Sequence, residues 1–478
     1  MKFDVVIVGA GVTGAMLARN LSRYHVSVCL LEKENDVAMG ASKANSGIVH
    51  GGYDPEPGTL KARLNTCGVE LLYQAAEELN VPCIRNGSMV CAFSEREEAH
   101  LEELLERGAE NNIGGLSILS GDEARKLEPY LSPEVTKVLH VPNAGIISPY
   151  ELTVAAVGNA MDNGVTLCRN FAVSAIAKTE AGFTVTAESG ETVTGAYLVN
   201  CAGGSADKIA AMAGDGFFTL IPRAGEYMLL DKAEGHKASH TLFQCPSKKG
   251  KGILVSPTVH GNLLIGPTAI PVETENSRDT TPEGLAEVVE LSLRTVPSVD
   301  TRQVITSFTG VRASEKSGDF ILQESKKVPG LIHAAAIDSP GLTCCVAIAQ
   351  SLTDLLVQAG LSLQQKDDWD GTREDPCAFR EMTDCEKDAY IKADPAYGKI
   401  VCRCETVSEG EILRAIHQNP GARDLDGVKR RTRSGMGRCQ GGFCGPYIMQ
   451  LLSRELGIPM EQVTKSGEGS QMLIGELK

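Results

Sequence analysis

The sequence has few aromatic residues and no excess of positive charge. Only 5% of its 478 residues are aromatic, one residue is Trp, and the formal net charge is −15. Proteins that bind nucleic acids need a net basic face against the phosphate backbone, so this composition argues against a nucleic-acid partner. We expect a small-molecule substrate instead.

The chain also lacks a long apolar run. No uninterrupted apolar segment reaches the ~18 residues that a membrane-spanning helix needs. The acidic Asp4 stands where a signal peptide would have its apolar stretch, and glycines follow soon after it. We therefore expect a cytoplasmic protein without a transmembrane segment, whose association with a membrane would come only through a partner.

Cysteine, in contrast, is abundant. The chain holds 15 cysteines, an odd number scattered over 478 residues. Without a secretion signal, such usage favours reduced thiols and metal ligation over a disulfide framework.

A chain of this length suggests about three domains at ~150 residues each.

The N-terminus has the pattern of a dinucleotide-binding βαβ unit. The apolar run Asp4–Gly9 predicts a strand buried on both faces, and Val12–Tyr24 predicts an amphipathic helix. A second strand at Val26–Leu31 ends in Glu32. An acid at this strand end is placed to bind ribose hydroxyls.

The glycines between the first strand and the helix have separate roles. Gly9 permits a tight turn, Gly11 lets the backbone approach a pyrophosphate, and Gly14 allows close packing of the helix. The helix N-terminus at Val12 and Thr13 offers free N–H groups to phosphates. The alternative is a glycine turn with a purely structural role.

The rest of the chain favours FAD over NAD. A pyridine-nucleotide reductase would carry a second glycine fingerprint, and the sequence has none. Instead, the apolar strand Tyr197–Cys201 runs into Ala202 and Gly203, which is a further support for a long dinucleotide. The reducing equivalents should therefore come from the substrate.

Hydrophobic periodicity predicts the remaining elements. Helices are expected at Thr59–Asn80, Glu95–Glu110 and Leu342–Gly360, and strands at Phe183–Ala187, Leu263–Ile265 and Leu331–Ile337. The polar, acidic and proline-interrupted segment Gln364–Glu386 suggests a linker that wraps the main body. Its Trp369 is expected to anchor the linker in a groove.

Four cysteines near the C-terminus have the spacing of a metal centre. Cys402-x-Cys404 is followed, after 34 residues, by Cys439-x-x-x-x-Cys444. Two pairs of thiolates can hold both irons of a [2Fe–2S] cluster. Structural zinc sites, the rival, usually use the wider Cys-x-x-Cys spacing. The remaining alternative is a site that binds no metal.

Glycine and basic residues surround these cysteines. Gly435, Gly437, Gly441 and Gly442 would let backbone N–H groups reach the sulfurs. The cations in this stretch would stabilise a net-anionic cluster and raise its potential; they are Lys429, Arg430, Arg431, Arg433 and Arg438. The alternative interpretation is a solvated basic face or a docking patch for an acidic partner.

The segment Gly40–Arg63 resembles the D-amino-acid-oxidase-type flavoprotein superfamily. Within that superfamily it is most similar to type II bacterial glycerol-3-phosphate oxidases and dehydrogenases, and L-2-hydroxyglutarate oxidases share much of it. Three further segments are similar to the glycerol-3-phosphate branch: Gly250–Pro257 with Gly266–Thr268, Phe308–Arg312 and Ser339–Thr343. The unit from about residue 396 resembles the bacterioferritin-associated-ferredoxin-like [2Fe–2S] domain.

The resemblance implies an α/β fold of three parts. An FAD-dependent oxidoreductase would span residues 1–365, with a Rossmann-like FAD-binding part at about 1–80, 145–215 and 305–365. An α+β substrate part, mainly antiparallel sheet, would take about 81–144 and 216–304. A linker at 366–395 would lead to a small helical [2Fe–2S] domain at 396–478.

The resemblance also assigns roles to single residues. His50 would lie by the flavin ring as the base, and Lys251 and Arg312 would contact the substrate. The alternatives are a hydrogen-bonding role for His50 and solvated surface positions for the two cations. Ser339 precedes a helix N-terminus that would face the flavin pyrimidine. The remaining cofactor contacts implied are Ser42, Asn45, Ser46, Val173, Gly341, Leu342 and Thr343.

The function expected from these features is oxidation of glycerol 3-phosphate to dihydroxyacetone phosphate by hydride transfer to flavin N5. Electrons would leave through the [2Fe–2S] cluster to a partner subunit or carrier. A 2-hydroxy-acid or amino-acid dehydrogenase, and a non-catalytic electron-transfer subunit, are the alternatives. One departure from the family pattern concerns the substrate: Ala334-Ala335-Ala336-Ile337-Asp338 stands where the strand usually ends in glycine. Asp338 would lie near the flavin or face solvent.

Overall fold

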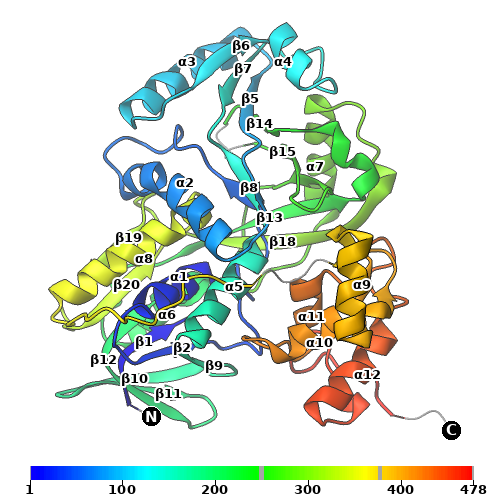
Figure 1. The fold of residues 1–478 in the computed structure, drawn as a ribbon. Coiled ribbons are helices and arrows are strands. Elements are labelled where there is room, and N and C mark those ends of the chain that lie inside the picture. Colours follow the sequence, from blue (N-terminus) through cyan, green and yellow to red (C-terminus); the bar gives the residue numbers. More distant parts are fainter. Residues whose placement is uncertain (1, 247–251, 375–378, 476–478) are drawn as a thin grey trace.

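The computed structural model describes residues 2–246, 252–374 and 379–475. Figure 1 shows a nucleotide-binding sheet, a second large sheet above it, and a helical C-terminal domain beside them. The mixed α/β architecture and the helical C-terminal domain confirm the predicted fold class.

The nucleotide-binding sheet is built around five parallel strands. Their order is β20 (Leu331–Ala335), β12 (Thr192–Asn200), β1 (Lys2–Val8), β2 (Val28–Leu31) and β9 (Thr166–Cys168). Antiparallel strands β10 (Val173–Thr179), β11 (Gly182–Ala187) and β19 (Ile321–Glu324) extend it. Val5 and Ile7 of β1 face one apolar core and Val6 and Val8 another, so the apolar run is buried on both faces as predicted.

Helices cover both faces of this sheet. On one face lie α1 (Val12–Leu21), α5 (Pro149–Asp162) and α8 (Gly341–Gln358), and on the other lies α6 (Ala206–Met212). Helix α8 is long and apolar enough to cross a membrane by length and composition, with a mean hydropathy of 1.3. Because 56% of that segment is buried in the fold, α8 is a core helix here.

The second large sheet is mainly antiparallel, with one parallel pairing between β14 and β5. Its strands are β5 (Ser88–Ala92), β6 (Ser117–Ser120), β7 (Lys137–Val141), β13 (Ile221–Leu230), β14 (Thr241–Gln244), β15 (Leu254–Pro257), β16 (Leu263–Gly266), β17 (Ile270–Pro271) and β18 (Val304–Ser314). Helices α3 (Glu95–Glu110), α4 (Gly121–Leu127) and α7 (Pro282–Thr295) pack on it. Helix α2 (Leu60–Glu78) and the small sheet of β3 (Ile48–Val49), β4 (Cys83–Ile84) and β8 (Gly145–Ile147) lie between the two large sheets.

Strand β18 corrects the expected division between the two parts. Residues from 305 onward were predicted to belong to the FAD-binding part, but β18 pairs with β13 from Ser314 back to Val304. The substrate part therefore extends to about residue 314, because the long β13 offers a full ladder of backbone partners to β18. Element ends also differ slightly: the first helix ends at Leu21 and the last strand of the nucleotide sheet at Ala335.

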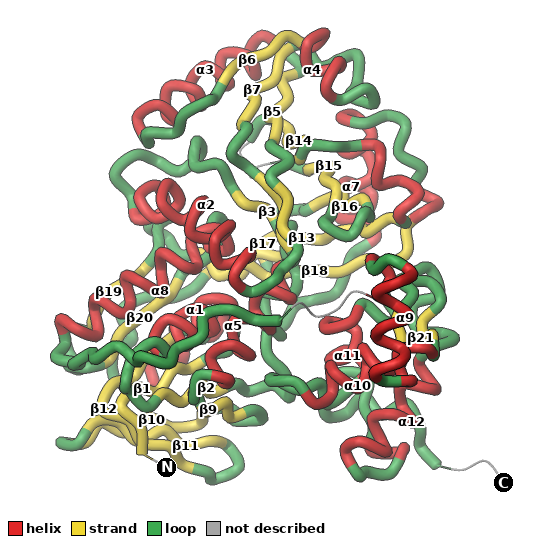
Figure 2. The backbone as a smooth tube through the Cα atoms, viewed as in Figure 1, coloured by secondary structure: helices red, strands yellow, loops and turns green. Residues whose placement is uncertain are grey.

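The segment after α8 crosses the body before it reaches the C-terminal domain (Figure 2). The indole nitrogen of Trp369 donates to the Ser22 hydroxyl at 3.0 Å, and Arg23 lies 4.4 Å from the ring centre. The expected linker 366–395 is not uniformly irregular, because it contains helix α9 (Asp384–Ala393) with a capping box at Thr383 and Glu386.

The C-terminal domain has its own small core. Strands β21 (Ile400–Cys402) and β22 (Val407–Ser408) precede helices α10 (Glu409–His417), α11 (Leu425–Thr432) and α12 (Gly445–Leu456). Ile412, Ile416, Val428 and Leu452 are fully or almost fully buried among these elements. Helix packing thus forms the domain beside the segments that carry the four cysteines, from the end of β21 at Cys402 to the start of α12 at Cys444.

An ion-pair cluster joins this domain to the nucleotide sheet. Asp36, in the loop after β2, accepts from Arg430 at 2.5 Å and from Arg431 at 2.7 Å, and its side chain is 1% exposed. Burial alone would raise the pKa of the Asp36 carboxyl, but the charges and hydrogen bonds of Arg431 and Arg430 hold it well below its usual range.

We expect Asp36→Asn to lower the apparent melting temperature at neutral pH, because two buried guanidinium groups lose their counter-charge. Breaking such a pair costs about 3–5 kcal/mol. The wild-type advantage is full above the pKa of an unfolded aspartate, about 3.9, and is lost as the pH falls below it. Thermal unfolding from neutral pH to about pH 3 measures it.

The matched control is Asp384→Asn, which removes a fully exposed carboxylate that lies 3.8 Å from Lys387. We expect this variant to melt like the wild type throughout. A difference between Asp36→Asn and wild type that stayed constant down to the acid end would contradict the assignment.

Candidate functional site

A cavity of about 1380 Å³ lies between the nucleotide-binding sheet and the second large sheet. Its wall includes the glycine turn after β1, the loop Gly40–Ile48, the turn after β12 and the start of α8. The predicted residues on the wall are Gly9, Gly11, Val12, Thr13, Glu32, Ser42, Asn45, Ser46, His50, Val173, Ala202, Gly203, Arg312, Ser339, Gly341 and Leu342. The topology thus brings residues as far apart in the chain as Gly9 and Leu342 to one cavity.

The glycine turn is as tight as its sequence predicts. Gly9 has φ +105°, and a Cβ built on it would lie 2.4 Å from the main-chain oxygen of Cys201. A Cβ on Gly14 would lie 2.0 Å from the oxygen of Gly9, so this residue does not line the cavity but lets α1 pack against β1. A Cβ built on Gly11 would lie 3.2 Å from the Ser42 hydroxyl oxygen, so this position is less crowded than Gly9 or Gly14 and leaves room for a ligand to approach the backbone.

Glu32 and Ser42 hold the backbone around this turn. Glu32 accepts from the N–H groups of Ala10 at 2.9 Å and Glu34 at 3.0 Å. Burial raises the pKa of Glu32, although both N–H groups favour the ionised form. The Ser42 hydroxyl accepts from the N–H of Val12 at 2.8 Å, at the start of α1. The glycines, the acid and the helix start fit the adenosine diphosphate half of a dinucleotide.

His50 is fixed from three sides. Its N–H donates to the Thr343 hydroxyl at 2.9 Å, and its carbonyl accepts from the Asn65 amide at 2.7 Å. Its ring stacks on Phe243 with centroids 6.0 Å apart, and Nε2 lies 3.2 Å from the Ser339 hydroxyl. The structure therefore brings His50 and Ser339 together at the cavity, whereas Thr343 supports the His50 backbone from behind the wall.

Arg312 enters the cavity from β18 on the opposite side. Its two terminal nitrogens each lie 3.3 Å from the main-chain oxygen of Thr268. A Cβ on Gly225 would lie 2.7 Å from the guanidinium and 2.9 Å from the Cβ of Pro267, so glycine at this position leaves room for Arg312 in its observed position. Lys251, expected beside Arg312 at the substrate, lies outside the described residues.

Arg223 is a cavity residue that the sequence did not reveal. It lies on β13 directly opposite Arg312 in the antiparallel ladder, and both side chains line the cavity. Two guanidinium groups on one wall favour an anionic ligand such as a phosphate or carboxylate. The pairing register that brings them together joins positions 89 residues apart, and no local pattern signals it.

Asp338, the departure from the family pattern, lines the cavity and is ion-paired. Lys61 approaches one of its oxygens at 2.6 Å, and the Ser314 hydroxyl donates to the other at 2.8 Å. The nearby Ala336 has φ +55°, a conformation that favours glycine and costs an alanine of order 1 kcal/mol. The local backbone therefore keeps the shape that a glycine would have given it.

The four predicted cysteines of the C-terminal domain approach one another as two pairs. The sulfurs of Cys404 and Cys439 are 3.7 Å apart. A hydrogen bond with Cys444, and backbone N–H groups of Gly435 and Glu405, lower the pKa of Cys402 to about 5 against the effect of its burial. Among the described residues no three Cys, His, Asp or Glu converge on a single point.

This arrangement fits a centre in which two irons share four thiolates in pairs. A Cβ on Gly437 would lie 2.3 Å from the Cβ of Cys404, so the loop needs glycine to come this close. Burial opposes ionisation of Cys439, but backbone N–H groups of Phe443 and Gly441 outweigh it and lower its pKa. Cys402 and Cys444 are buried, whereas Cys404 is exposed to solvent.

The basic residues near the cysteines are mostly paired across the domain boundary. Arg430 and Arg431 bind Asp36, Arg433 binds Glu405 at 3.0 Å, and Arg438 lies 3.3 Å from Asp231. The alternative of a solvated basic face is therefore wrong for Arg430, Arg431 and Arg433, whose side chains are buried in these pairs, whereas the side chain of Arg438 stays 66% exposed beside Asp231.

We expect Cys439→Ser to abolish the cluster while the rest of the protein stays folded, because one iron loses a thiolate ligand. Iron and acid-labile sulfide analysis should fall close to zero, and the flavin absorbance should remain. The control is Cys385→Ser, an exposed cysteine at the start of α9. Loss of iron in both variants, or retention in both, would refute the assignment.

Comparison with known proteins agrees with both halves of the site. Residues 4–355 match the FAD dependent oxidoreductase family, and residues 400–454 match the BFD-like [2Fe-2S] binding domain. Glycerol 3-phosphate dehydrogenase of Caloramator mitchellensis is 44% identical over 476 residues, covering 100% of this chain and 99% of that protein. L-2-hydroxyglutarate dehydrogenase of Pongo abelii is 25% identical over 381 residues, covering 75% and 88%.

A solved structure has the same fold over the first three quarters of the chain. Dithionite-reduced L-alpha-glycerophosphate oxidase from Mycoplasma pneumoniae with FAD bound has a TM-score of 0.74 and 33% identity, and the match covers 78% of this chain and 98% of that one. Its extent agrees with a body that binds FAD and a separate C-terminal domain that holds the cluster. The chain therefore belongs to the FAD dependent oxidoreductase family and ends in a BFD-like [2Fe-2S] binding domain.

Proposed function

We propose that this chain is an FAD-dependent glycerol 3-phosphate dehydrogenase that yields dihydroxyacetone phosphate. The observation that carries the proposal is the cavity itself, which His50, Arg223 and Arg312 line beside the nucleotide site. The relative covering the whole chain, including its C-terminal domain, bears the same activity in its name. FAD, when bound, supplies an acceptor for the hydride from the secondary alcohol.

The arginines are proposed to bind the phosphate. Arg312 presents two donors from one guanidinium, and Arg223 adds a second positive charge from the neighbouring strand. The terminal nitrogens of Arg312 donate to a neutral carbonyl, that of Thr268, which does not neutralise the guanidinium charge, so this charge is available to an anion. A phosphate dianion matches two guanidinium groups better than a monocarboxylate does.

His50 is proposed as the base. A neutral imidazole can take the proton of the substrate hydroxyl near neutral pH. The Ser339 hydroxyl, 3.2 Å from Nε2, and the stacked Phe243 ring fix the direction of the imidazole. The bound alcohol thus loses a proton to His50 while its C–H hydrogen leaves as hydride, and a ketone results.

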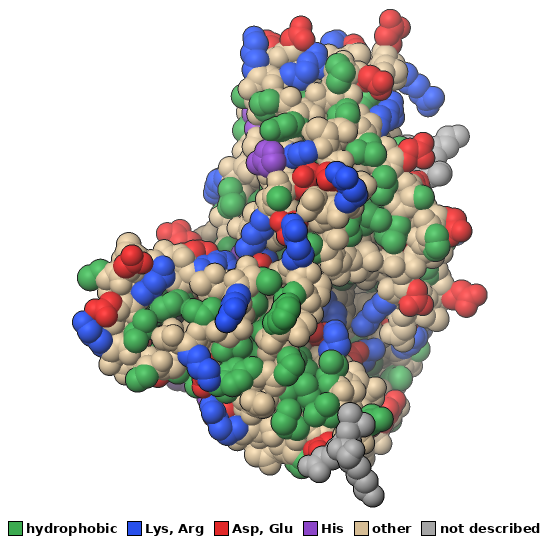
Figure 3. Space-filling model, turned by 90° about the vertical axis from the view of Figure 1, so that its right-hand side faces the viewer, with side chains coloured by type: hydrophobic (Ala, Val, Ile, Leu, Met, Phe, Trp, Pro, Cys, Tyr) green, Lys and Arg blue, Asp and Glu red, His purple; other side chains and the backbone are tan. Residues whose placement is uncertain are grey.

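The cluster is proposed to carry electrons out of the protein. Cys404 is exposed and Cys439 is half-buried, so one side of the cysteine site is open to an external acceptor. Phe443, between Gly442 and Cys444, is 89% exposed, and the face of the C-terminal domain in Figure 3 carries further apolar side chains. This surface is suited to binding a one-electron carrier protein or a partner subunit. Any association of the enzyme with a membrane would come through that partner.

An anaerobic titration of the purified protein with glycerol 3-phosphate tests the proposal. We expect the flavin absorbance to bleach with substrate alone, because the enzyme takes its electrons from the metabolite. Bleaching by L-2-hydroxyglutarate or by an amino acid, but not by glycerol 3-phosphate, would assign the arginines to a carboxylate. Flavin that no small metabolite reduces would leave the electron-transfer subunit as the function.

We expect Arg312→Ala to raise the KM for glycerol 3-phosphate about 10–100-fold, because a charge-assisted hydrogen bond contributes about 1.5–3 kcal/mol. The flavin content should not change. Steady-state kinetics with an artificial acceptor measure the effect, and Arg302→Ala, which removes an exposed arginine paired with Asp300, is the control. An unchanged KM in Arg312→Ala would remove this residue from the phosphate site.

A further inference from the structure

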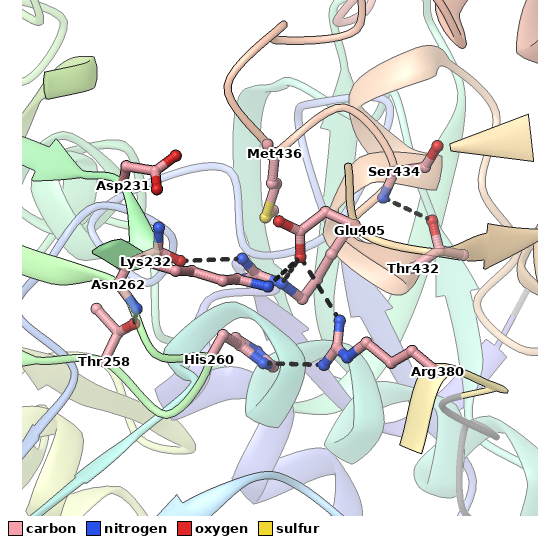
Figure 4. Close-up of polar contacts among 12 residues, drawn as sticks. Asp231, Lys232, Thr258, His260, Asn262, Arg380, Glu405, Thr432, Ser434 and Met436 are labelled. Carbon is pink, nitrogen blue, oxygen red and sulfur yellow. Dashed lines mark hydrogen bonds and ion pairs between the residues drawn. The ribbon is translucent and has the colours of Figure 1, made fainter. Parts of the chain in front are cut away.

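A buried carboxylate beside the cluster gathers cations from three parts of the chain. Glu405 follows the ligand Cys404, and its side chain is 3% exposed. Its Oε2 accepts from Lys232 of the body at 3.0 Å and from Arg433 of the cluster domain at 3.0 Å, and Arg380 of the connecting segment lies 3.6 Å away. Figure 4 shows Lys232 and Arg380 reaching Glu405 from different elements.

The network continues to the first turn of helix α5. Arg433 donates to the Tyr150 hydroxyl and to Oδ1 of Asn262, each at 3.3 Å. Arg380 also lies 3.5 Å from Nδ1 of His260, whose Nε2 is 3.1 Å from Glu151. Two successive residues of α5, Tyr150 and Glu151, are therefore held by groups that Glu405 organises.

The segment that leads into α5 packs directly against a segment that lines the cavity. Strand β8 precedes it and pairs with β3, which leads into His50. The N–H of Ile147 donates to the oxygen of Gly47 at 2.7 Å, and Gly47 lines the cavity. A Cβ on Gly47 would lie 2.5 Å from the oxygen of Ile147, so the two segments are in closest contact here.

The same turn of α5 touches the cluster loop on its other side. The Tyr150 hydroxyl donates to the sulfur of Met436 at 3.6 Å, and Met436 lies three residues before Cys439. A short series of contacts therefore runs from the cavity through Gly47, Ile147 and Tyr150 to Met436.

We propose that Glu405 and Arg433 are positioning residues that hold the cluster loop against Tyr150, and that electrons pass from the cavity to the cluster across this junction. The proposal rests on the electron path of the proposed function. Two electrons taken from the substrate would cross one at a time, because a [2Fe–2S] cluster, when bound, accepts one electron, on one of its two ferric ions, and must pass it on before it accepts the next. A one-electron acceptor outside the protein, ferricyanide in a test, then takes each electron.

Because Glu405 is charged, its removal has opposite effects on the rate of electron transfer through the cluster potential and through the position of the loop, so the two effects can be told apart. Removing a negative charge beside the cluster raises its potential, which would favour electron flow onto it. Removing the same charge also leaves Arg433 buried and unpaired, so the loop is expected to shift away from Tyr150. Slower transfer at a raised potential therefore reports displacement and not driving force.

The experiment compares Glu405→Gln with Arg431→Gln, which removes an equally buried ion pair at the same domain boundary. The partner of Arg431 is Asp36 in the loop after β2, whereas the partners of Glu405 lead to Tyr150 and Glu151 in the first turn of α5. The flavin is reduced anaerobically by a light flash with EDTA as donor, so the result does not depend on the substrate. Cluster reduction is followed by absorbance and by electron paramagnetic resonance of rapidly frozen samples. Iron content and cluster potential are measured for each variant.

We expect electron arrival at the cluster to slow at least tenfold in Glu405→Gln, with a potential equal to or above that of the wild type, and to be unchanged in Arg431→Gln. Backbone hydrogen exchange at 145–151 and 433–439 should quicken only in Glu405→Gln. Equal transfer rates in the two variants, or equal slowing in both, would overturn the proposal. Where Glu405→Gln does not retain iron, Tyr150→Phe decides the question, because it removes only the hydroxyl between Arg433 and Met436.

The result is independent of the substrate assignment. Flash-driven transfer that depends on Glu405, in a protein whose flavin glycerol 3-phosphate does not bleach, would support the junction and refute the proposed substrate. If glycerol 3-phosphate bleaches the flavin but electron transfer to the cluster is unchanged in Glu405→Gln and Tyr150→Phe, the proposed substrate is supported and the junction is refuted.

Discussion

The cavity depends on one constraint, which is that parallel strands end at the same edge of a sheet. Strands β1, β2, β12 and β20 run parallel, and the segment after each contributes to the wall: the glycine turn, Glu32, Ala202–Ser205 and Ile337–Leu342. The edge is usable only because Gly9 and Gly14 let three backbone segments approach within normal contact distance. A Cβ on Gly14 would separate α1 from β1, and a Cβ on Gly9 would separate the turn after β1 from the segment after β12, so either would open the phosphate end of the cavity.

The second sheet closes the cavity with a different chemistry. The nucleotide sheet contributes backbone N–H groups, an acid and hydroxyls, which suit a dinucleotide. The antiparallel sheet contributes the guanidinium groups of Arg223 and Arg312 and the Phe243 ring. The small sheet of β3, β4 and β8 lies between them and carries His50 at its edge. His50 thus lies where the nucleotide-binding sheet and the sheet that carries the two arginines meet.

Electrostatics attach the cluster domain to this body. In a chain with a net charge of −15, Arg430 and Arg431 of the C-terminal domain pair with the buried Asp36 of the body, and Arg433 pairs with the buried Glu405, which also binds Lys232 of the body. Buried pairs of this kind add less to stability than their number suggests, because desolvation offsets the attraction, but they specify one relative position. A fixed position is what coupling a two-electron flavin to a one-electron cluster requires, since electron transfer slows steeply with distance.

The sequence by itself determined the features that depend on neighbouring residues. The strand, glycine turn, helix and Glu32 of the nucleotide site, and the two cysteine pairs, are local patterns whose geometry follows from backbone sterics and thiolate chemistry. Only the tertiary structure decided which distant groups meet. Strand register placed Arg223 opposite Arg312 and put β18 in the second sheet. Packing of α8 placed the Thr343 hydroxyl at the His50 N–H and not on the cavity wall. Docking of the C-terminal domain placed Arg430, Arg431 and Arg433 in buried ion pairs and not on a basic surface. These contacts join positions tens to hundreds of residues apart, so charge and periodicity along the chain carry no signal of them.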